Sequence, residues 1–246
     1  MKKRRGATAK GYLEKATDPR QYDAGEINWS NYGKGDHPIR TFYKEVLRKE
    51  LGNLEGKRVL DVGSGSGAFF DFIKELGALE IQGIEPSATN YEISKKLFPQ
   101  ISVFHGELRQ SQFAEQFDLI LAIMVFEHIL DLPSAYGKIH SLLKNGGKFC
   151  LIFQDEGRLL DPNFDQPVDF ENTGNGVIVS KVVSFFGTTY NLLRPTNTYI
   201  KTAEENGFIL EKHLPLFPSE SLCRAIPRYK NSKGKPIRHL LVLVKK

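Results

Sequence analysis

Short apolar runs alternate with amphipathic stretches through the middle of the chain. The apolar runs cover residues 58–62, 79–84, 101–104, 117–125 and 148–153. Stretches with apolar residues at helical spacing separate them, at 66–76, 87–97, 107–113 and 133–143. Nearly continuous apolar strands alternating with helices predict an α/β fold with a parallel sheet that helices cover on both faces. Because such crossovers are right-handed, the sheet is expected to be doubly wound.

One helix is expected before this alternation. Its apolar residues fall on one face, which predicts a helix over 37–51 that Gly52 ends. Residues 6–36 are polar and contain glycine, so they predict an irregular arm or a frayed helix. The expected organisation is a basic, partly irregular arm at 1–36, followed by a single domain at 37–246.

The pattern changes after the fifth apolar run. Residues 155–194 are longer than a standard connection and predict a lid inserted over the site. An amphipathic patch within them predicts a helix and consists of Ile178, Val179, Val182, Val183 and Phe186. A helix near 196–206 and strands at 208–213 and 237–244 are expected to close the chain. Because no long helix separates these strands, they are expected to pair antiparallel.

Composition narrows the class of protein. With 246 residues, 40% of them hydrophobic and 26% charged, the chain cannot be a disulfide-stapled miniprotein, a collagen-like repeat or a disordered tail. Cys150 and Cys223 form no framework and no zinc spacing, so we expect a reduced cytoplasmic protein without a metal. No apolar run reaches the roughly 18–20 residues of a spanning helix, and residues 1–8 do not resemble a secretory signal.

The net charge of +5 is unevenly distributed. Residues 2–5 carry four positive charges, and residues 224–246 carry eight more with no acidic residue. The body between them, 6–223, has a net charge of −7. A basic protein invites a nucleic-acid interpretation, but here only the two ends are basic.

The strongest local motif runs from Val59 to Phe69 and contains Gly63, Gly65 and Gly67. It lies where an apolar strand gives way to a helix, and glycines there let the backbone turn sharply and approach a ligand. The G-x-G-x-G spacing differs from the G-x-G-x-x-G of dinucleotide sites. It also lacks the Gly-Lys-Ser/Thr ending of a phosphate-binding loop.

Two further motifs follow the next two strands. Glu85, followed by Pro86 and Ser87, ends the strand after the glycine motif, where a carboxylate can accept hydrogen bonds from both hydroxyls of a ribose. His105–Leu108 follows the third strand, in position to cover an adenine ring. The fourth strand runs into Phe126-Glu127-His128.

Together these motifs resemble the class I S-adenosylmethionine-dependent methyltransferases, in particular the branch that acts on small molecules and quinone precursors. The resemblance covers roughly residues 56–153. It implies a Rossmann-like seven-stranded sheet, mostly parallel, with an antiparallel C-terminal edge strand. It also implies S-adenosyl-L-methionine as cofactor and S-adenosyl-L-homocysteine as product.

The resemblance assigns the cofactor site residue by residue. Asp61 would help to hold the methionine end, and Glu85 the ribose. Glu107 stands where the family often has Asp at the adenine. Trp29, Tyr32 and Arg40 are candidates for closing over the methionine end, where an aromatic face beside a sulfonium is favourable. The full expected set is Tyr32, Arg40, Asp61, Gly63, Ser64, Gly65, Ser66, Gly67, Phe69, Glu85, Pro86, Ser87, Gly106, Glu107, Leu108, Ala122, Met124, Val125 and His128.

Catalysis and acceptor binding are less constrained by the sequence. If the acceptor is protonated, His128 is the candidate general base, because its ordinary pKa lies near neutrality; the alternative is that it orders its loop. The residues expected to contact the acceptor are Phe185, Phe186, Tyr190 and Arg194. The Asn/Asp-Pro-Pro-aromatic sequence of nucleic-acid amino-methyltransferases is absent, so a small-molecule acceptor is expected.

Three alternatives remain open at this point. The basic C-terminal segment would suit an RNA methyltransferase, whose binding weakens steeply with salt. A non-catalytic cofactor-binding partner subunit would keep the fold without an acceptor pocket. A nicotinamide-dependent oxidoreductase is disfavoured by the glycine spacing. No membrane association is expected, and a monomer or homodimer suits the chain.

Overall fold

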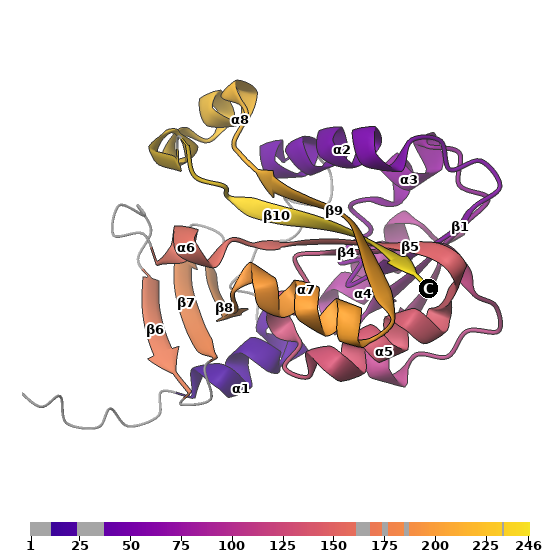
Figure 1. The fold of residues 1–246 in the computed structure, drawn as a ribbon, viewed down its shortest axis with the longest axis horizontal. Helices are drawn as coiled ribbons and strands as arrows, with labels where there is room; N and C mark the ends of the chain where they lie inside the picture. Colours follow the sequence, from indigo (N-terminus) through magenta and orange to yellow (C-terminus); the bar gives the residue numbers. More distant parts are fainter. Residues whose placement is uncertain (1–10, 24–36, 161–167, 174–176, 185–186, 233) are drawn as a thin grey trace, which may run out of the picture.

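The computed structural model describes residues 11–23, 37–160, 168–173, 177–184, 187–232 and 234–246. Its central element is a seven-stranded sheet in the order β3-β2-β1-β4-β5-β10-β9 (Figure 1). The strands are β1 (Arg58–Val62), β2 (Glu80–Glu85), β3 (Ser102–His105), β4 (Phe117–Ile123), β5 (Leu143–Gln154), β9 (Phe208–Leu216) and β10 (Arg238–Lys245). Only β10 runs antiparallel to its neighbours in this sheet. The predicted fold class is therefore confirmed. The edge strand is β9, and the antiparallel strand β10 lies between β9 and β5.

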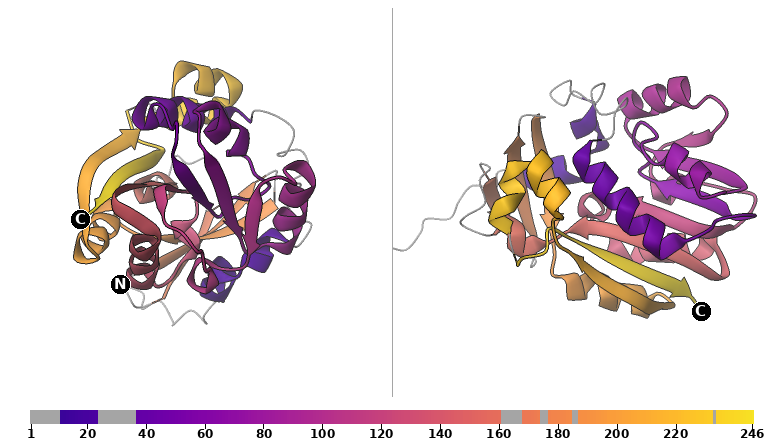
Figure 2. Two further views of the ribbon diagram at one scale, coloured as in Figure 1. Left: turned by 90° about the vertical axis from the view of Figure 1, so that its right-hand side faces the viewer. Right: turned by 90° about the horizontal axis from the view of Figure 1, so that it is seen from above.

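Helices cover both faces of the sheet. On one face α2 (Pro38–Leu51) and α3 (Phe70–Glu75) pack against it, and on the other α5 (Leu132–Leu142) and α7 (Thr196–Glu205) do so (Figure 1). The short helix α8 (Glu220–Ala225) lies beside α2, as the view from above shows (Figure 2). The remaining crossover helix, α4 (Ala88–Leu97), packs against β2 and β3.

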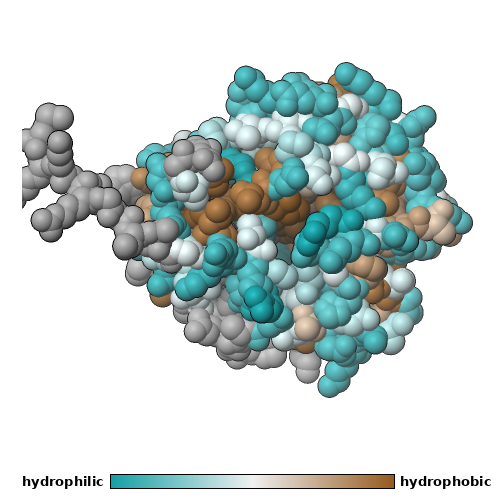
Figure 3. Space-filling view, turned by 90° about the horizontal axis from the view of Figure 1, so that it is seen from below, coloured by the Kyte–Doolittle hydropathy of each residue, from teal (hydrophilic) through white to brown (hydrophobic). Residues whose placement is uncertain are grey.

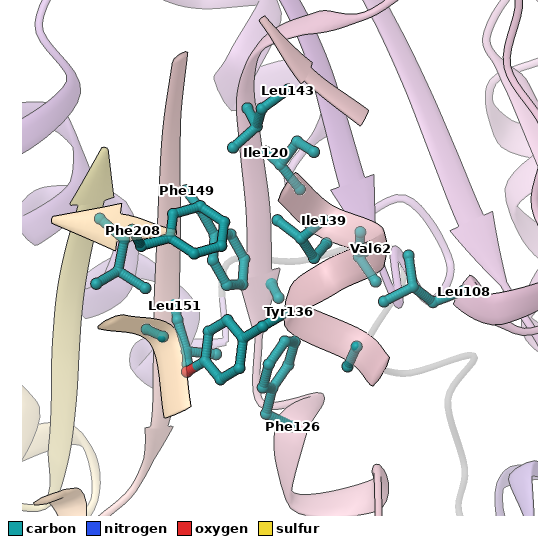
Figure 4. Close-up of a cluster of buried hydrophobic side chains, with 14 of the residues drawn as sticks. Val62, Leu108, Ile120, Phe126, Tyr136, Ile139, Leu143, Phe149, Leu151 and Phe208 are labelled. Atoms are coloured by element: carbon teal, nitrogen blue, oxygen red, sulfur yellow. The ribbon is translucent and has the colours of Figure 1, made fainter. Parts of the chain in front are cut away.

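The largest core cluster lies between the sheet and α5. Tyr136 of α5 is fully buried among Phe126, Phe149 and Phe208, with ring centroids 5.2–6.0 Å from its own (Figure 4). Rings at these separations add edge-to-face attraction to the burial of apolar surface. This cluster fixes the end of β4 and the residues that follow it, which border the functional site.

A second, three-stranded antiparallel sheet is built from the segment predicted to be a lid. It consists of β6 (Val168–Asn172), β7 (Ile178–Ser184) and β8 (Gly187–Leu193), and α6 (Glu156–Leu159) precedes it. The predicted helix at 178–186 is wrong. Val179 packs against α1 (Tyr12–Thr17), whereas Val182 packs against Leu159 and Leu193. Because both faces of this small sheet are covered, the strand shows no simple alternation and its apolar spacing mimics a helix.

The helix predicted over 107–113 is also wrong. Only a 3₁₀ turn, η3 (Leu108–Gln110), forms there. Gln110 and Glu107 cap each other reciprocally, and Ser111 has an extended backbone with its hydroxyl donating to the Leu108 carbonyl. Side chains that satisfy local backbone groups in this way end a helix early.

The described residues on the face drawn in Figure 3 are predominantly hydrophilic. Figure 3 shows a hydrophobic area near the centre of one face, with hydrophilic residues around most of it. None of the helices in the described residues combines the length and the hydrophobicity needed to cross a bilayer.

Candidate functional site

A cavity of about 760 Å³ opens at the carboxyl ends of the parallel strands β1, β2 and β4. In open α/β sheets, ligands bind at this edge. The cavity is also bordered by α1 and the 3₁₀ turn η1 (Pro19–Tyr22), by β7 and β8, and by the segment that leads into β10. Its volume lies within the range of small-molecule sites. The cavity is therefore the candidate site.

The glycine motif forms the turn between β1 and α3. Gly63 and Gly67 have φ angles of 66° and 85°. A Cβ on Gly63 would lie 2.5 Å from the Val125 side chain, and one on Gly67 would lie 2.7 Å from Phe98. Both positions therefore require glycine for backbone conformation as well as space. Gly63, Ser64, Gly65, Ser66 and Phe69 line the cavity, whereas Gly67 packs behind it.

Glu85 holds this turn in place from the end of β2. Its carboxylate accepts hydrogen bonds from the Gly65 N–H at 2.7 Å and the Ser87 N–H at 2.8 Å. The side chain is buried, and burial raises the pKa of Glu85 to about 7. A carboxylate has about four acceptor sites, so it can also accept from ligand hydroxyls. Pro86 lines the cavity, while Ser87 is buried and caps α4.

Asp61, near the end of β1, is a buried acid in the cavity wall with an unsatisfied oxygen and a strongly raised pKa. It is only 2% exposed, and its Oδ2 atom has no hydrogen-bond partner. Burial, with a smaller contribution from the charge of Glu85, raises the pKa of Asp61 to about 8. Buried polar atoms are normally hydrogen-bonded. An unsatisfied carboxylate oxygen in a cavity wall therefore fits a cationic ligand group that donates hydrogen bonds.

His128 does not present a free basic nitrogen, which favours the predicted alternative that it orders its loop over the role of a general base. Its Nδ1 lies 3.2 Å from the Ala16 carbonyl, and its Nε2 lies 2.5 Å from the Tyr22 hydroxyl. A nitrogen facing a carbonyl must donate, so Nδ1 carries the proton and Nε2 accepts from Tyr22. Burial lowers the pKa of His128 to about 4. His128 therefore lines the cavity, but both of its ring nitrogens bind the N-terminal segment that contains Ala16 and Tyr22.

Ala122, Met124 and Val125, at the end of β4 and just after it, were predicted to contact the cofactor, and only two of them line the cavity. Met124 and Val125 line the cavity, whereas Ala122 is fully buried in the core beneath them. Met124 adopts a φ of 59°, the one positive φ of a non-glycine residue in the described part of the chain. Strained backbone of this kind gathers at functional sites. Of the residues predicted to cover the adenine, Glu107 and Leu108 line the cavity, and Gly106 does not.

The structure contradicts two of the predicted acceptor contacts and leaves the others open. Arg194 is buried, and its guanidinium donates to the carbonyls of Phe126, Ile129 and Leu130 at 2.8–3.2 Å. Tyr190 packs on Tyr12 rather than facing the cavity. Arg40 lines the cavity, and its role at the methionine end stays a prediction. The other candidates lie outside the described residues, and these are Trp29, Tyr32, Phe185 and Phe186.

The contacts of Arg194 predict a stabilising role. In Arg194→Lys a compact ammonium group replaces the planar guanidinium group that donates to three carbonyls. We expect the free energy of unfolding to fall by about 1–3 kcal/mol, because buried carbonyls lose donors. Urea denaturation measures the change, and Lys201→Arg on an exposed face of α7 is the control. An unchanged unfolding midpoint would show that these contacts do not stabilise the loop.

Several cavity residues escaped the sequence analysis. They come from segments far apart in the chain and are Tyr22, Tyr43, Gln154, Arg158, Arg228, Tyr229 and Arg238. One signal was available for Arg238. It opens an otherwise apolar strand, and the antiparallel pairing places it opposite Gln154, the last residue of β5. The predicted strand direction therefore already placed this arginine at the carboxyl edge.

Comparisons with known proteins agree with this geometry. A methyltransferase domain model matches residues 36–229. A ubiquinone biosynthesis O-methyltransferase of Rhodopseudomonas palustris (strain BisB5) is 35% identical over 116 residues. The match spans 46% of this chain and 45% of that protein, so less than half of the relative is covered.

Solved structures share the fold. An S-adenosylmethionine-dependent methyltransferase from Mesorhizobium loti superposes with a TM-score of 0.65 at 18% identity, covering 82% of this chain and 96% of that one. A putative one from Listeria monocytogenes gives 0.67 at 17% identity, covering 86% and 100%. The chain belongs to the methyltransferase domain family.

Proposed function

We propose that this protein transfers a methyl group from S-adenosylmethionine to a small-molecule acceptor. The observation that carries the proposal is the buried, unsatisfied Oδ2 of Asp61 in the cavity wall. S-adenosylmethionine has an ammonium group that can donate to this oxygen, and it has ribose hydroxyls that can donate to Glu85. The glycine turn leaves room for the backbone to approach such a ligand. The residues present therefore fit this cofactor.

The chemistry divides between cofactor and protein. The bound cofactor supplies an electrophilic methyl group on a positively charged sulfur. The protein's task is to align the acceptor with that methyl and to exclude water. Met124 and Val125 border the part of the cavity next to the glycine turn, where the acceptor would approach.

We propose that the N-terminal arm and the lid segment cover this site. Thr17 and Tyr22 border the cavity from the arm, and Val182 and Asn191 do so from the small sheet. The Tyr22–His128 contact ties the arm to the loop after β4. His128 would then position the cover instead of removing a proton from the acceptor.

A transfer assay tests the proposed function. The protein is incubated with methyl-labelled S-adenosylmethionine and a cell extract separated into small molecules, RNA and protein. We expect S-adenosylhomocysteine to form and label to enter the small-molecule fraction, because the cavity has the volume of a small-molecule site. Label entering only RNA would contradict the proposal and support the RNA alternative. Cofactor binding without any transfer would support the non-catalytic alternative.

A further inference from the structure

The basic C-terminal segment does not form one outer surface. Lys245 is buried and donates to the carbonyls of His140 and Leu143, both at 2.8 Å. Arg224 lies 3.8 Å from Glu220 on the exposed side of α8. Two others, Arg228 and Arg238, line the cavity. Part of the positive charge near the C-terminus is therefore directed at the candidate site.

Two groups of charged residues in the cavity lining bear on the ligands that it can bind. Acidic residues, Asp61 and Glu85, stand at the glycine turn. A second group comes from α6, the 3₁₀ turn η5 (Pro227–Ser232) and the start of β10, and consists of Arg158, Arg228 and Arg238. A cationic cofactor suits the first group, and an anion suits the second.

Arg238 carries charge that its immediate neighbours do not neutralise. Its guanidinium donates to the Ile237 carbonyl at 2.6 Å and to the Met124 sulfur at 3.1 Å. No described carboxylate lies within ion-pair distance of Arg238. Glu127 is a buried acid near Arg238, and burial raises its pKa, but the two side chains do not form an ion pair. Charges removed from bulk water are normally paired, so an anion would complete this site.

Arg228 and Arg158 are arranged around one aromatic ring. The guanidinium carbons lie 5.5 Å and 4.8 Å from the centroid of Tyr229, which is itself buried. Cation–π attraction orients the Arg228 guanidinium without neutralising it. Among the described residues, Arg228 has no carboxylate within ion-pair distance either.

The position of these arginines connects them to the acceptor. The contact between Arg238 and Met124 brings the guanidinium to the residue that follows β4, next to Val125, whose side chain lies against Gly63 of the glycine turn. Resting on the proposed function, we infer that the methyl acceptor is a small acid, whose carboxylate or phosphate group binds Arg228 and Arg238. Guanidinium groups bind both anions through paired hydrogen bonds. The negative charge of such an acceptor would also attract the cationic cofactor beside it.

Matched probe molecules test this inference. Binding of 4-hydroxybenzoate, phenyl phosphate and the neutral 4-hydroxybenzamide to the protein saturated with S-adenosylhomocysteine is measured by titration calorimetry. We expect at least one of the two acids to bind about tenfold more tightly than the amide, because charge-assisted hydrogen bonds are lost in the neutral probe. Comparison of the two acids distinguishes a carboxylate site from a phosphate site. Equal binding of all three probes, or no binding by either acid, would overturn the inference.

Substitutions connect the preference to the residues. Arg228→Gln, at a partly exposed position, is expected to remove the preference for the acid, whereas Arg224→Gln on the outer side of α8 should keep it. An unchanged preference in Arg228→Gln would overturn the assignment. S-adenosylhomocysteine titrated alone reports the proposed function separately, so its binding without any acid preference would refute only this inference. Displacement by an oligoribonucleotide, with no binding of free acids, would assign the arginines to nucleic acid.

Discussion

Asp61→Asn is expected to weaken the binding of S-adenosylmethionine by about 10–100-fold, because a charge-assisted hydrogen bond contributes about 1.5–3 kcal/mol. The carboxylate oxygen that loses its charge is buried and has no partner within the protein. Titration calorimetry at pH 7.5 measures the loss. Asp71→Asn, on the exposed side of α3, is the control and should bind normally. Unchanged affinity in Asp61→Asn would mean that this oxygen does not contact the ligand.

Ligand binding by the wild-type protein should depend on pH through Asp61. The pKa of Asp61 is about 8 in the empty cavity, so the carboxyl is mostly protonated near neutrality. A cationic ligand favours the carboxylate, so binding should release a proton and tighten as the pH rises from about 6 to 7.5. Calorimetry in two buffers of different ionisation enthalpy counts the released protons. The proton release should be reduced in Asp61→Asn.

Stability of the empty protein should change in the opposite direction. The folded-state pKa of Asp61, about 8, lies above its ordinary value of 3.8. The folded state therefore holds the proton more strongly, and stability is lost as the pH rises from about 4 through about 8. An asparagine cannot ionise, so Asp61→Asn should melt several degrees higher than the wild type at pH 8.5. A melting difference that does not depend on pH would contradict the buried, protonated carboxyl.

Glu85→Ala is expected to have the second large effect, on both binding and stability. The substitution removes the acceptor for the Gly65 and Ser87 N–H groups and thereby releases the glycine turn. We expect the free energy of unfolding to fall by about 2–4 kcal/mol and affinity for S-adenosylhomocysteine to fall at least about 100-fold. Chemical denaturation and calorimetry measure the two effects. Glu92→Ala, on an exposed position of α4, is the control.

Glu85→Gln separates the two roles of this residue. The amide keeps one oxygen that can accept from the backbone but loses the negative charge. Stability should therefore recover in part, while ligand affinity stays below that of the wild type. Wild-type affinity in both Glu85 variants would mean that the ribose contact is wrongly assigned.

The sequence predicted the central sheet because its strands are buried on both faces and read as continuous apolar runs. The acids Asp61 and Glu85 could be placed for the same reason, since Asp61 lies near the end of such a strand and Glu85 ends one. The small sheet could not be predicted, because helix α1 packs on β7 from more than 150 residues upstream and obscures the strand pattern. Tertiary contacts of this kind override local spacing.

The site residues also divide into those that a local segment positions and those that distant contacts position. The residues on the glycine turn were predictable because one short segment positions them. Arg194 was placed in the wrong role, because its three carbonyl partners lie 64–68 residues away. The role of His128 depends on Tyr22, 106 residues away in the chain. A residue that the sequence assigns to the site can thus form its hydrogen bonds with residues far away in the chain, and only the fold reveals those partners.

The basic C-terminal segment shows how charge is reassigned by folding. In the sequence it is a run of eight cations without an acid, which favours nucleic acid as an alternative partner. In the structure Lys245 caps backbone carbonyls in the interior, and Arg228 and Arg238 border the cavity. The excess of cations in residues 224–246 is therefore not by itself evidence of a nucleic-acid-binding surface.

The most direct test of the central claim is the melting temperature of the protein with S-adenosylmethionine, S-adenosylhomocysteine or NAD, each at a high and equal concentration. A ligand that binds only the folded state stabilises it by about 2.7 kcal/mol at one hundred times its dissociation constant. We predict that both adenosyl ligands raise the melting temperature and that NAD does not. A rise with NAD alone would contradict the account.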